Sequence, residues 1–443
     1  MENVKNLQAD AVVVGSGPGG ASVARDLTLK GKKVIILEQG KDVPPRGGAF
    51  RGGGEYLGGP SAMSLKKGIL LSSEKTLMVR GVTTGGSSMM YLGTAYDPDP
   101  EMWRPFGFDL QHENDEIKEE LNVKPLPDDL IGPGASLIMK SAQELGYNWK
   151  KFNKLINAEK CVKGCNECIF GCKRGAKFHA RDWVMDAVQK GATLLNNTYC
   201  DELIVENGVA VGVRATGKDG TKYEINASVS VISAGGVGSP CILQRSGIYD
   251  AGRKFFVDPF VMACGTFRKD IGLDKEAMMV SGMHLKEDGI VFSDMLYPYP
   301  LYAGYAMMAL KYSALAHYKR TIPIMIKIRD DMDGFVNIEN GISKPLTFED
   351  QYKLNTGRAI AREILKKAGV RDEDIWYTIP GAAHPGGTCA MGKIVNENLE
   401  TQYKNAFVCD ASVIPVPFGI PPTLTLLSLG RRLANYLVST RLN

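Results

Sequence analysis

The sequence of 443 residues has no run of about 18 apolar residues, no run of five basic residues, and only five histidines. Without a long apolar run, we expect no membrane span. The net charge of +4 is small for this length, so the composition does not predict nucleic-acid binding. The first residues have no basic stretch followed by an apolar one, which predicts a cytoplasmic protein without a signal peptide.

The first 40 residues predict a β-α-β unit that binds a dinucleotide. An apolar strand at 11–14 runs into a glycine-rich turn, and a helix is expected to begin directly after it. The first glycine permits the tight turn, the second lets the backbone approach a pyrophosphate, and the last allows close packing of helix on strand. An acidic residue at the end of the second strand is placed to accept hydrogen bonds from a ribose. The candidate binding residues here are Gly15, Gly17, Pro18, Gly20 and Glu38.

Strands of the nucleotide-binding type occur in three separate parts of the chain, with further apolar strands at 229–234 and 406–409. A discontinuous nucleotide-binding domain with an inserted second domain is usual for FAD enzymes, whereas NAD dehydrogenases usually keep one contiguous block. We therefore predict an α/β fold. It has a Rossmann-like FAD-binding domain in three segments and an inserted α+β substrate domain built on an antiparallel sheet. The expected segments are 1–110, 181–254 and 383–443 for the FAD-binding domain, 111–180 for a cysteine-rich insertion, and 255–382 for the substrate domain.

Two C-terminal motifs resemble the glucose–methanol–choline (GMC) flavin oxidoreductases. They read Ala383-His384-Pro-Gly-Gly-Thr-Cys-Ala-Met-Gly392 and Val408-Cys-Asp410-Ala411-Ser-Val-Ile-Pro415. Earlier in the chain, Gly85-Gly86-Ser87-Ser88 is similar to the family's first signature, which contacts the flavin and its pyrophosphate. The stretch 235–248 is similar to the second signature. The resemblance spans nearly the whole chain.

This resemblance implies FAD as cofactor and hydride transfer from an alcohol carbon to flavin N5. His384 occupies the family's position for the histidine that removes the hydroxyl proton, a role that needs a pKa near the working pH. Residues 80–95 contain no histidine, the residue through which some relatives attach the flavin, so we expect non-covalent FAD. The other cofactor-binding positions that the resemblance implies are Gly86, Ser87, Asp410, Ala411, Pro422 and Thr423.

Pro421 departs from the family pattern, which usually has a second His or Asn here to assist the base. A proline side chain neither donates nor accepts a hydrogen bond, so we expect any assisting group to come from elsewhere in the chain. Tyr91 is a second departure, because the first signature normally has Asn or His there.

Four of the nine cysteines, Cys161, Cys165, Cys168 and Cys172, fall within twelve residues. The spacing of the last three matches the tail of a bacterial ferredoxin motif, and soft sulfur ligands favour iron–sulfur clusters or zinc. Some GMC relatives hold an iron–sulfur cluster in a cysteine-rich segment of this region. We expect a 4Fe-4S or 3Fe-4S cluster. Structural zinc and unliganded or redox-active thiols are the alternatives.

These features predict an FAD-dependent dehydrogenase that takes a hydride from a CH–OH group of a small organic substrate. Single electrons would leave through the cluster to a protein acceptor or to a further subunit. One alternative is a reductase, in which a ferredoxin-type donor reduces the flavin and the flavin reduces a C=O or C=C bond. The other is a non-catalytic electron-transfer subunit, in which His384 has no chemical role.

Overall fold

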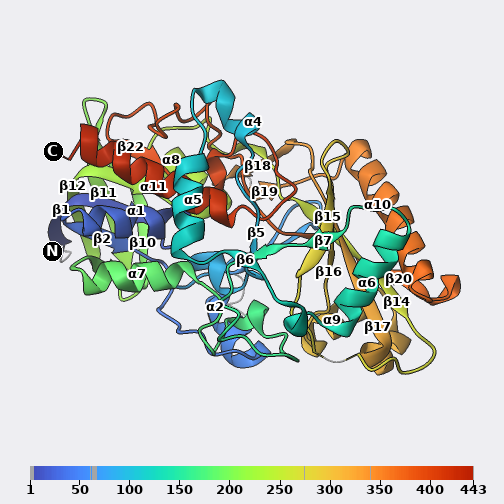
Figure 1. Cartoon of the computed structure of the whole chain (residues 1–443). Coiled ribbons are helices and arrows are strands. Elements are labelled where there is room, and N and C mark those ends of the chain that lie inside the picture. The colour runs from blue at the N-terminus through green and yellow to red at the C-terminus, as the bar shows by residue number, and fades with distance from the viewer. Residues whose placement is uncertain (1–3, 60, 62–66, 274, 340, 443) are drawn as a thin grey trace.

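The computed structural model describes residues 4–59, 61, 67–273, 275–339 and 341–442, and these fold around two large sheets (Figure 1). The first sheet has the strand order β10-β11-β12-β1-β2-β9, and β22 also pairs with β12. β12, β1, β2, β9 and β22 are parallel, whereas β10 and β11 are antiparallel. Its strands are β1 (Val4–Val14), β2 (Val34–Leu37), β9 (Thr193–Leu195), β10 (Thr198–Glu206), β11 (Val209–Gly217), β12 (Lys222–Ile232) and β22 (Ala406–Val408).

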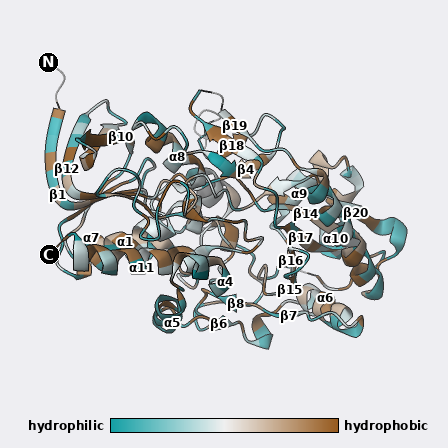
Figure 2. Cartoon of the chain, turned by 90° about the horizontal axis from the view of Figure 1, so that it is seen from above, coloured by the Kyte–Doolittle hydropathy of each residue, from teal (hydrophilic) through white to brown (hydrophobic). Residues whose placement is uncertain are grey.

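The parallel strands of this sheet are buried over most of their length, which explains their near-continuous Val, Ile and Leu runs. α1 packs between α11 and α7, and α5 packs against α11. Figure 2 shows α5 as mostly hydrophilic, as expected for a helix at the surface. The helices around this sheet are α1 (Pro18–Leu29), α5 (Gln111–Glu120), α7 (Ala180–Gln189), α8 (Gly235–Arg245) and α11 (Thr423–Thr440).

The second sheet has the order β3-β4-β21-β14-β17-β16-β15-β7, and β20 pairs with β14. All its pairs are antiparallel except β4 with β21. α10 and α6 pack on this sheet. Its strands are β3 (Ile69–Leu71), β4 (Leu77–Val79), β7 (Lys150–Lys151), β14 (Pro259–Thr266), β15 (Ser281–Leu285), β16 (Ile290–Asp294), β17 (Thr321–Ile328), β20 (Ile375–Tyr377) and β21 (Gly381–Ala382). Its helices are α6 (Pro133–Glu144), α9 (Tyr299–Met308) and α10 (Phe348–Lys367).

The structure also has two three-stranded sheets and two short α-helices, besides short 3-10 and π-helical turns. One small sheet contains β5 (Thr94–Ala95), β6 (Lys124–Pro125) and β8 (Asn153–Lys154). The other contains β13 (Arg253–Phe255), β18 (Gly334–Asn337) and β19 (Gly341–Ser343). The short helices are α2 (Gly54–Tyr56) and α4 (Pro100–Trp103). Across the described residues, no helix combines the length and the apolar character needed to cross a membrane.

The predicted fold class is confirmed, because a largely parallel sheet with helices adjoins a largely antiparallel one. The first sheet draws its strands from the start, the middle and the end of the chain. β3 and β4, from the segment 1–110, and β7, from the segment 111–180, pair in the second sheet. These strands have two or three residues each, and their sequences carry no alternation long enough to reveal them.

A buried ion pair connects the ends of two strands of the second sheet, close to His384. Asp330, after β17, lies 3.1 Å from the ammonium of Lys344, and both side chains are fully buried. The Asp330 carboxylate also accepts hydrogen bonds from the backbone N–H groups of Val257 and Asp258, each at 3.0 Å. The pair therefore ties the end of β17 to the residues that lead into β14.

Replacing Lys344 with Met is expected to lower the free energy of unfolding by about 3–5 kcal/mol, because a buried carboxylate then has no cation. Chemical denaturation measures this loss. Arg104→Ala is the control, since Arg104 pairs with Glu101 on the surface and the expected loss is below about 1 kcal/mol. Equal, small losses for both variants would contradict the structural role of the Lys344–Asp330 pair.

Candidate functional site

The turn between β1 and α1 has the geometry that its glycines predict. Gly15 has a φ of 102°, and an added Cβ would lie 2.2 Å from the Ser233 carbonyl oxygen. An added Cβ on Gly20 would lie 2.1 Å from the Gly15 carbonyl oxygen, so only glycine allows this packing. At Gly17 the same Cβ would meet no atom within 4 Å. Gly17 precedes Pro18 at the start of α1, and no side chain caps this helix end. Open space before uncapped N–H groups suits a pyrophosphate.

Glu38 lies buried directly after β2, beside this turn. One carboxylate oxygen accepts hydrogen bonds from the backbone and hydroxyl of Ser16, and the other accepts one from the Gly40 N–H at 2.8 Å. Burial raises the pKa of Glu38, and its hydrogen bonds oppose that shift. A carboxylate has about four lone-pair sites, so Glu38 keeps capacity to accept from a ribose hydroxyl.

The first signature lies against the same turn. The Ser16 hydroxyl, which binds Glu38, also accepts a hydrogen bond from the Gly85 N–H at 3.0 Å. An added Cβ on Gly86 would lie 3.1 Å from the Gly17 Cα, so the two backbones approach closely. The Ser87 hydroxyl accepts from the Gly81 N–H at 3.0 Å and holds the segment in place. The structure therefore brings together the turn, Glu38 and the first signature.

Asp410 organises the second signature from inside the protein. Its carboxylate accepts hydrogen bonds from the Gly235 N–H at 2.7 Å, the Ser412 N–H at 2.8 Å and the Ser239 hydroxyl. The carbonyl of Ala411 accepts from the Gly387 N–H at 3.1 Å, which links this segment to the loop after His384. Pro422 and Thr423 form the start of α11, which has no side-chain cap.

The sheet register brings His384 beside two charged groups that the sequence did not indicate. β14 lies between β21 and β17, and Phe260 pairs with both Gly381 and Lys327. Asp258 precedes β14, and its carboxylate lies 2.9 Å from His384 Nδ1. The Lys327 ammonium lies 3.5 Å from the same nitrogen. Asp258 is fully buried, but the His384 side chain keeps 22% of its surface exposed, so Nε2 is the nitrogen left for a substrate.

Burial shifts the pKa of all three side chains, His384, Asp258 and Lys327. Burial lowers the pKa of His384 well below 6.5, and the positive charge of Lys327 lowers it further. Burial raises the pKa of Asp258 to about 7, and Lys327 is the main opposing influence. Burial lowers the pKa of Lys327 to about 8, against the attraction of Asp258. The imidazole is therefore neutral at pH 7, as a base must be.

Asp258 also contacts the segment that contains Pro421. The Gly419 N–H, two residues before that proline, donates to the second Asp258 oxygen at 3.0 Å. The carboxylate directly before β14 thus joins the histidine loop to the segment that leads into α11. The sequence did hold one signal for this group, because Lys327 is the single charge in the otherwise apolar strand 321–328.

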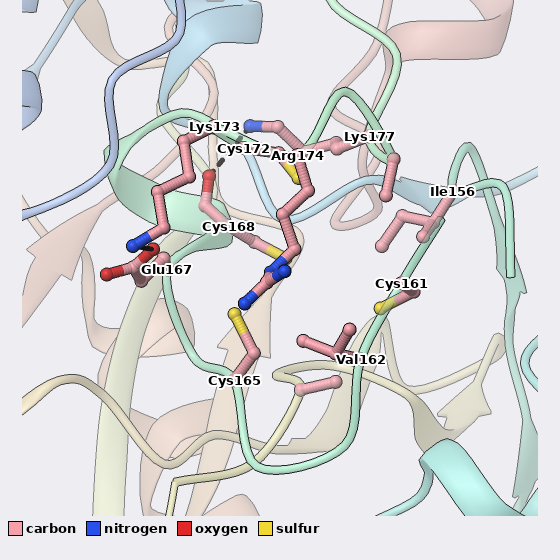
Figure 3. A pocket seen from close by; sticks show the side chains of 12 residues that line it. Ile156, Cys161, Val162, Cys165, Glu167, Cys168, Cys172, Lys173, Arg174 and Lys177 are labelled. Atoms are coloured by element: carbon pink, nitrogen blue, oxygen red, sulfur yellow. Dashed lines mark hydrogen bonds and ion pairs between the residues drawn. The ribbon is translucent and has the colours of Figure 1, made fainter. Parts of the chain in front are cut away.

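The four clustered cysteines line one pocket (Figure 3). All four are free thiols, and the basic residues Lys173, Arg174 and Lys177 line the pocket with them. Burial raises the pKa of Cys161 to about 11 and raises that of Cys168, so these thiols are protonated unless a cation binds. Among the described residues, no three His, Cys, Asp or Glu side chains are grouped so that they could hold a metal ion.

Lys177 connects this pocket to the first signature. Its buried Nζ lies 2.8 Å from the carbonyl oxygens of Cys168 and Tyr91, and 3.2 and 3.3 Å from those of Met89 and Ser88, so its three N–H groups are shared among four acceptors. Burial lowers the pKa of Lys177 to about 7. The Ser88 hydroxyl accepts in turn from the Ala180 N–H at 2.8 Å. The cysteine loop and the predicted flavin-binding segment therefore share one buried lysine.

Known proteins with similar sequences cover most of this chain. An uncharacterised protein of Methanocaldococcus jannaschii is 28% identical, over 96% of this chain and 98% of that protein. A long-chain-alcohol oxidase of Arabidopsis thaliana is 26% identical, over 100% of this chain and 69% of that protein. The crystal structure of pyridoxine 4-oxidase from Mesorbium loti has the same fold, with a TM-score of 0.72 at 17% identity over 97% of this chain and 99% of that one.

The family models agree with the motifs and with the fold. Residues 9–261 and 346–430 match the N-terminal and C-terminal models of the family described as GMC oxidoreductase. These ranges contain the glycine turn, both signatures, His384 and Asp410. The chain therefore belongs to the glucose–methanol–choline oxidoreductase family and is an FAD-dependent enzyme.

Proposed function

We propose that this enzyme oxidises a CH–OH group of a small organic substrate, with His384 as the base. The observation that carries this proposal is the contact of 2.9 Å between His384 Nδ1 and the buried carboxylate of Asp258. This contact leaves Nε2 with a free lone pair on the exposed side of the ring. FAD, when bound, supplies the hydride acceptor. The related long-chain-alcohol oxidases and pyridoxine 4-oxidase agree with an alcohol substrate by their names.

Each site residue has its own role in this proposal. His384 takes the hydroxyl proton at Nε2 as the carbon loses its hydride, and Asp258 stabilises the imidazolium that forms. Gly17 and the start of α1 bind the pyrophosphate, and Glu38 accepts from the ribose. Gly86 and Ser87 hold the flavin side of the cofactor, and Asp410 orders the segment around Ala411. Pro422 and Thr423 place the start of α11 at the cofactor, where its free N–H groups favour negative charge.

We further propose that Cys161, Cys165, Cys168 and Cys172 hold an iron–sulfur cluster of the 4Fe-4S or 3Fe-4S type. Four soft thiols around one pocket are the right donors in kind and number. The sequence spacing of Cys165, Cys168 and Cys172 matches the tail of a bacterial ferredoxin motif, which favours an iron–sulfur cluster over a single zinc ion.

The cluster, when bound, supplies a one-electron exit from the flavin. Lys177 supports this role, because its ammonium neutralises negative charge at the cysteines and binds the carbonyl oxygens of Cys168 and Tyr91 together. Electrons would pass to a protein acceptor or to a further subunit. We propose a cytoplasmic enzyme, since reduced thiols persist in that compartment.

Glu38→Ala is expected to weaken FAD binding by about 1–3 kcal/mol, roughly 5- to 150-fold in Kd, because a buried ribose hydroxyl loses its acceptor. Quenching of flavin fluorescence on reconstitution of the apo-protein measures this change, since the FAD is not covalently attached. Glu101→Ala is the control, because Glu101 is a surface carboxylate that pairs with Arg104 outside the site. Equal FAD affinity in Glu38→Ala and wild type would refute the assignment.

His384→Ala is expected to leave FAD bound and to slow flavin reduction by roughly 10²–10⁴-fold, the usual range for loss of a general base. Anaerobic stopped-flow absorbance with a panel of primary alcohols, from long-chain alkanols to pyridoxine, measures the rate. His112→Ala serves as control, because His112 is exposed on α5 and lies outside the site. A loss below about threefold for His384→Ala would favour the non-catalytic electron-transfer subunit instead.

Replacing Cys165 or Cys168 with Ser is expected to remove the iron and the broad visible absorbance of protein purified without oxygen. Flavin reduction by substrate should persist, while electron delivery to a one-electron acceptor should fail. Cys200→Ser is the control, since this buried cysteine lies in β10, outside the pocket. Iron and sulfide assays of the wild type decide between the alternatives. Zinc in place of iron, or neither metal, would overturn the cluster.

A further inference from the structure

The two contacts of the Asp258 carboxylate differ, because one partner can only donate a hydrogen bond and the other can donate or accept. One carboxylate oxygen accepts from the Gly419 backbone N–H at 3.0 Å, a group that can only donate. The other oxygen lies 2.9 Å from His384 Nδ1, which donates in one tautomer and accepts in the other. The pKa of Asp258 is about 7, so above that pH its carboxylate is ionised and only accepts, and a proton on Nδ1 then satisfies both contacts. The tautomer with the proton on Nε2 would set two acceptors against each other.

Lys327 stands on the same edge of the imidazole ring. Its ammonium lies 3.5 Å from Nδ1, and its side chain is buried in β17. An ammonium cannot accept from an N–H group, so the shorter contact of 2.9 Å with Asp258 decides the tautomer and Lys327 acts on the ring through its charge. A cation there opposes a second positive charge on the ring and favours the ionised form of Asp258. The next charged groups behind Asp258 are Asp330 and Lys344, which neutralise each other as a buried pair. On the β15 side, Lys327 acts on His284, and burial lowers the pKa of that histidine to about 4, so it is uncharged.

We propose that Asp258 and Lys327 are positioning residues that together replace the assisting His or Asn absent at Pro421. Asp258 fixes the His384 tautomer with the proton on Nδ1 and the lone pair on Nε2. Lys327 keeps His384 uncharged before it takes the substrate proton. This inference rests on the proposed role of His384. In the step itself, the substrate O–H bond breaks and its proton joins Nε2, the hydride leaves the same substrate's carbon for the flavin, and the proton on Nδ1 stays in its contact with Asp258.

The alternative is that Asp258 only ties the histidine loop to the Gly419 segment, without effect on the tautomer. Asp258→Asn separates the two roles. Because the Gly419 N–H must donate, the new side chain has to turn its oxygen to Gly419 and its NH₂ group to His384. The NH₂ group forces Nδ1 to accept, so the proton moves to Nε2. Asp258 has a φ of 48°, a conformation that Asn tolerates well, so the variant should fold.

The direct test is the ¹⁵N NMR spectrum of FAD-loaded protein labelled at histidine, with His384→Gln to assign the signal. We expect the Nδ1–H tautomer in wild type and the Nε2–H tautomer in Asp258→Asn. Asp294→Asn is the control, a buried carboxylate that binds Val280 and Ser281 and leaves the signal unchanged. Flavin reduction by primary alcohols should fall roughly 10²–10⁴-fold in Asp258→Asn, as it does when the same exchange inverts a catalytic histidine in Ser-His-Asp hydrolases. An Nε2–H tautomer in wild type, or the same tautomer in wild type and Asp258→Asn, would overturn the proposal.

A second measurement tests Lys327 through charge. A cation lowers the pKa of both Asp258 and His384, so Lys327→Met should move the rising limb of the pH profile of flavin reduction upward by about one to three pH units. Lys327→Arg keeps the charge, so its rising limb should lie at the same pH as that of wild type. An unchanged limb in Lys327→Met would remove Lys327 from the proposal.

The His384→Ala variant separates failure of this inference from failure of the proposed function. If its rate equals that of wild type, the proposed function fails, whatever the tautomer. If His384 is required but Asp258→Asn has the wild-type rate and tautomer, only the positioning inference fails.

Discussion

The Asp258 carboxylate is the contact on which the active-site geometry depends. It is buried directly before β14, and it binds the histidine loop with one oxygen and the segment leading into α11 with the other. The Lys344–Asp330 pair behind it holds the backbone of Val257 and Asp258. A buried charge of this kind lowers stability unless it is fully partnered, and here each carboxylate has backbone donors and a nearby cation. The histidine is therefore held by a network that spans β14, β17, β21 and the start of α11.

The buried side chain of Lys177 connects another pair of segments. It joins the cysteine loop to the end of the first signature through four backbone carbonyl oxygens. The cysteine pocket is thus in contact with the residues expected beside the flavin, although the two lie about 80 residues apart in sequence. In the proposed function, the hydride chemistry at His384 and the one-electron transfer at the cysteines would use the same flavin.

The sequence predicted the parts that depend on local rules. The roles of Gly15, Gly17 and Gly20 follow from turn geometry, and the structure has the close approaches that they permit. α10 begins after Thr347 with a capping box that Asp350 completes, a local pattern of the same kind. Asp258 and Lys327 could not be predicted as site residues, because their meeting with His384 depends on the register of three strands that are distant in sequence. The two- and three-residue strands β3, β4 and β7 were missed for lack of any pattern.

The central claim is that the enzyme takes a hydride from an alcohol carbon while His384 takes the proton. Anaerobic mixing of the FAD-loaded enzyme with a primary alcohol, unlabelled or deuterated at the carbinol carbon, tests it most directly. The account predicts that the oxidised flavin absorbance bleaches, and that it bleaches more slowly with the deuterated alcohol. A flavin that stays oxidised with the alcohol, but is reoxidised by the corresponding aldehyde once reduced, would contradict the account and indicate a reductase.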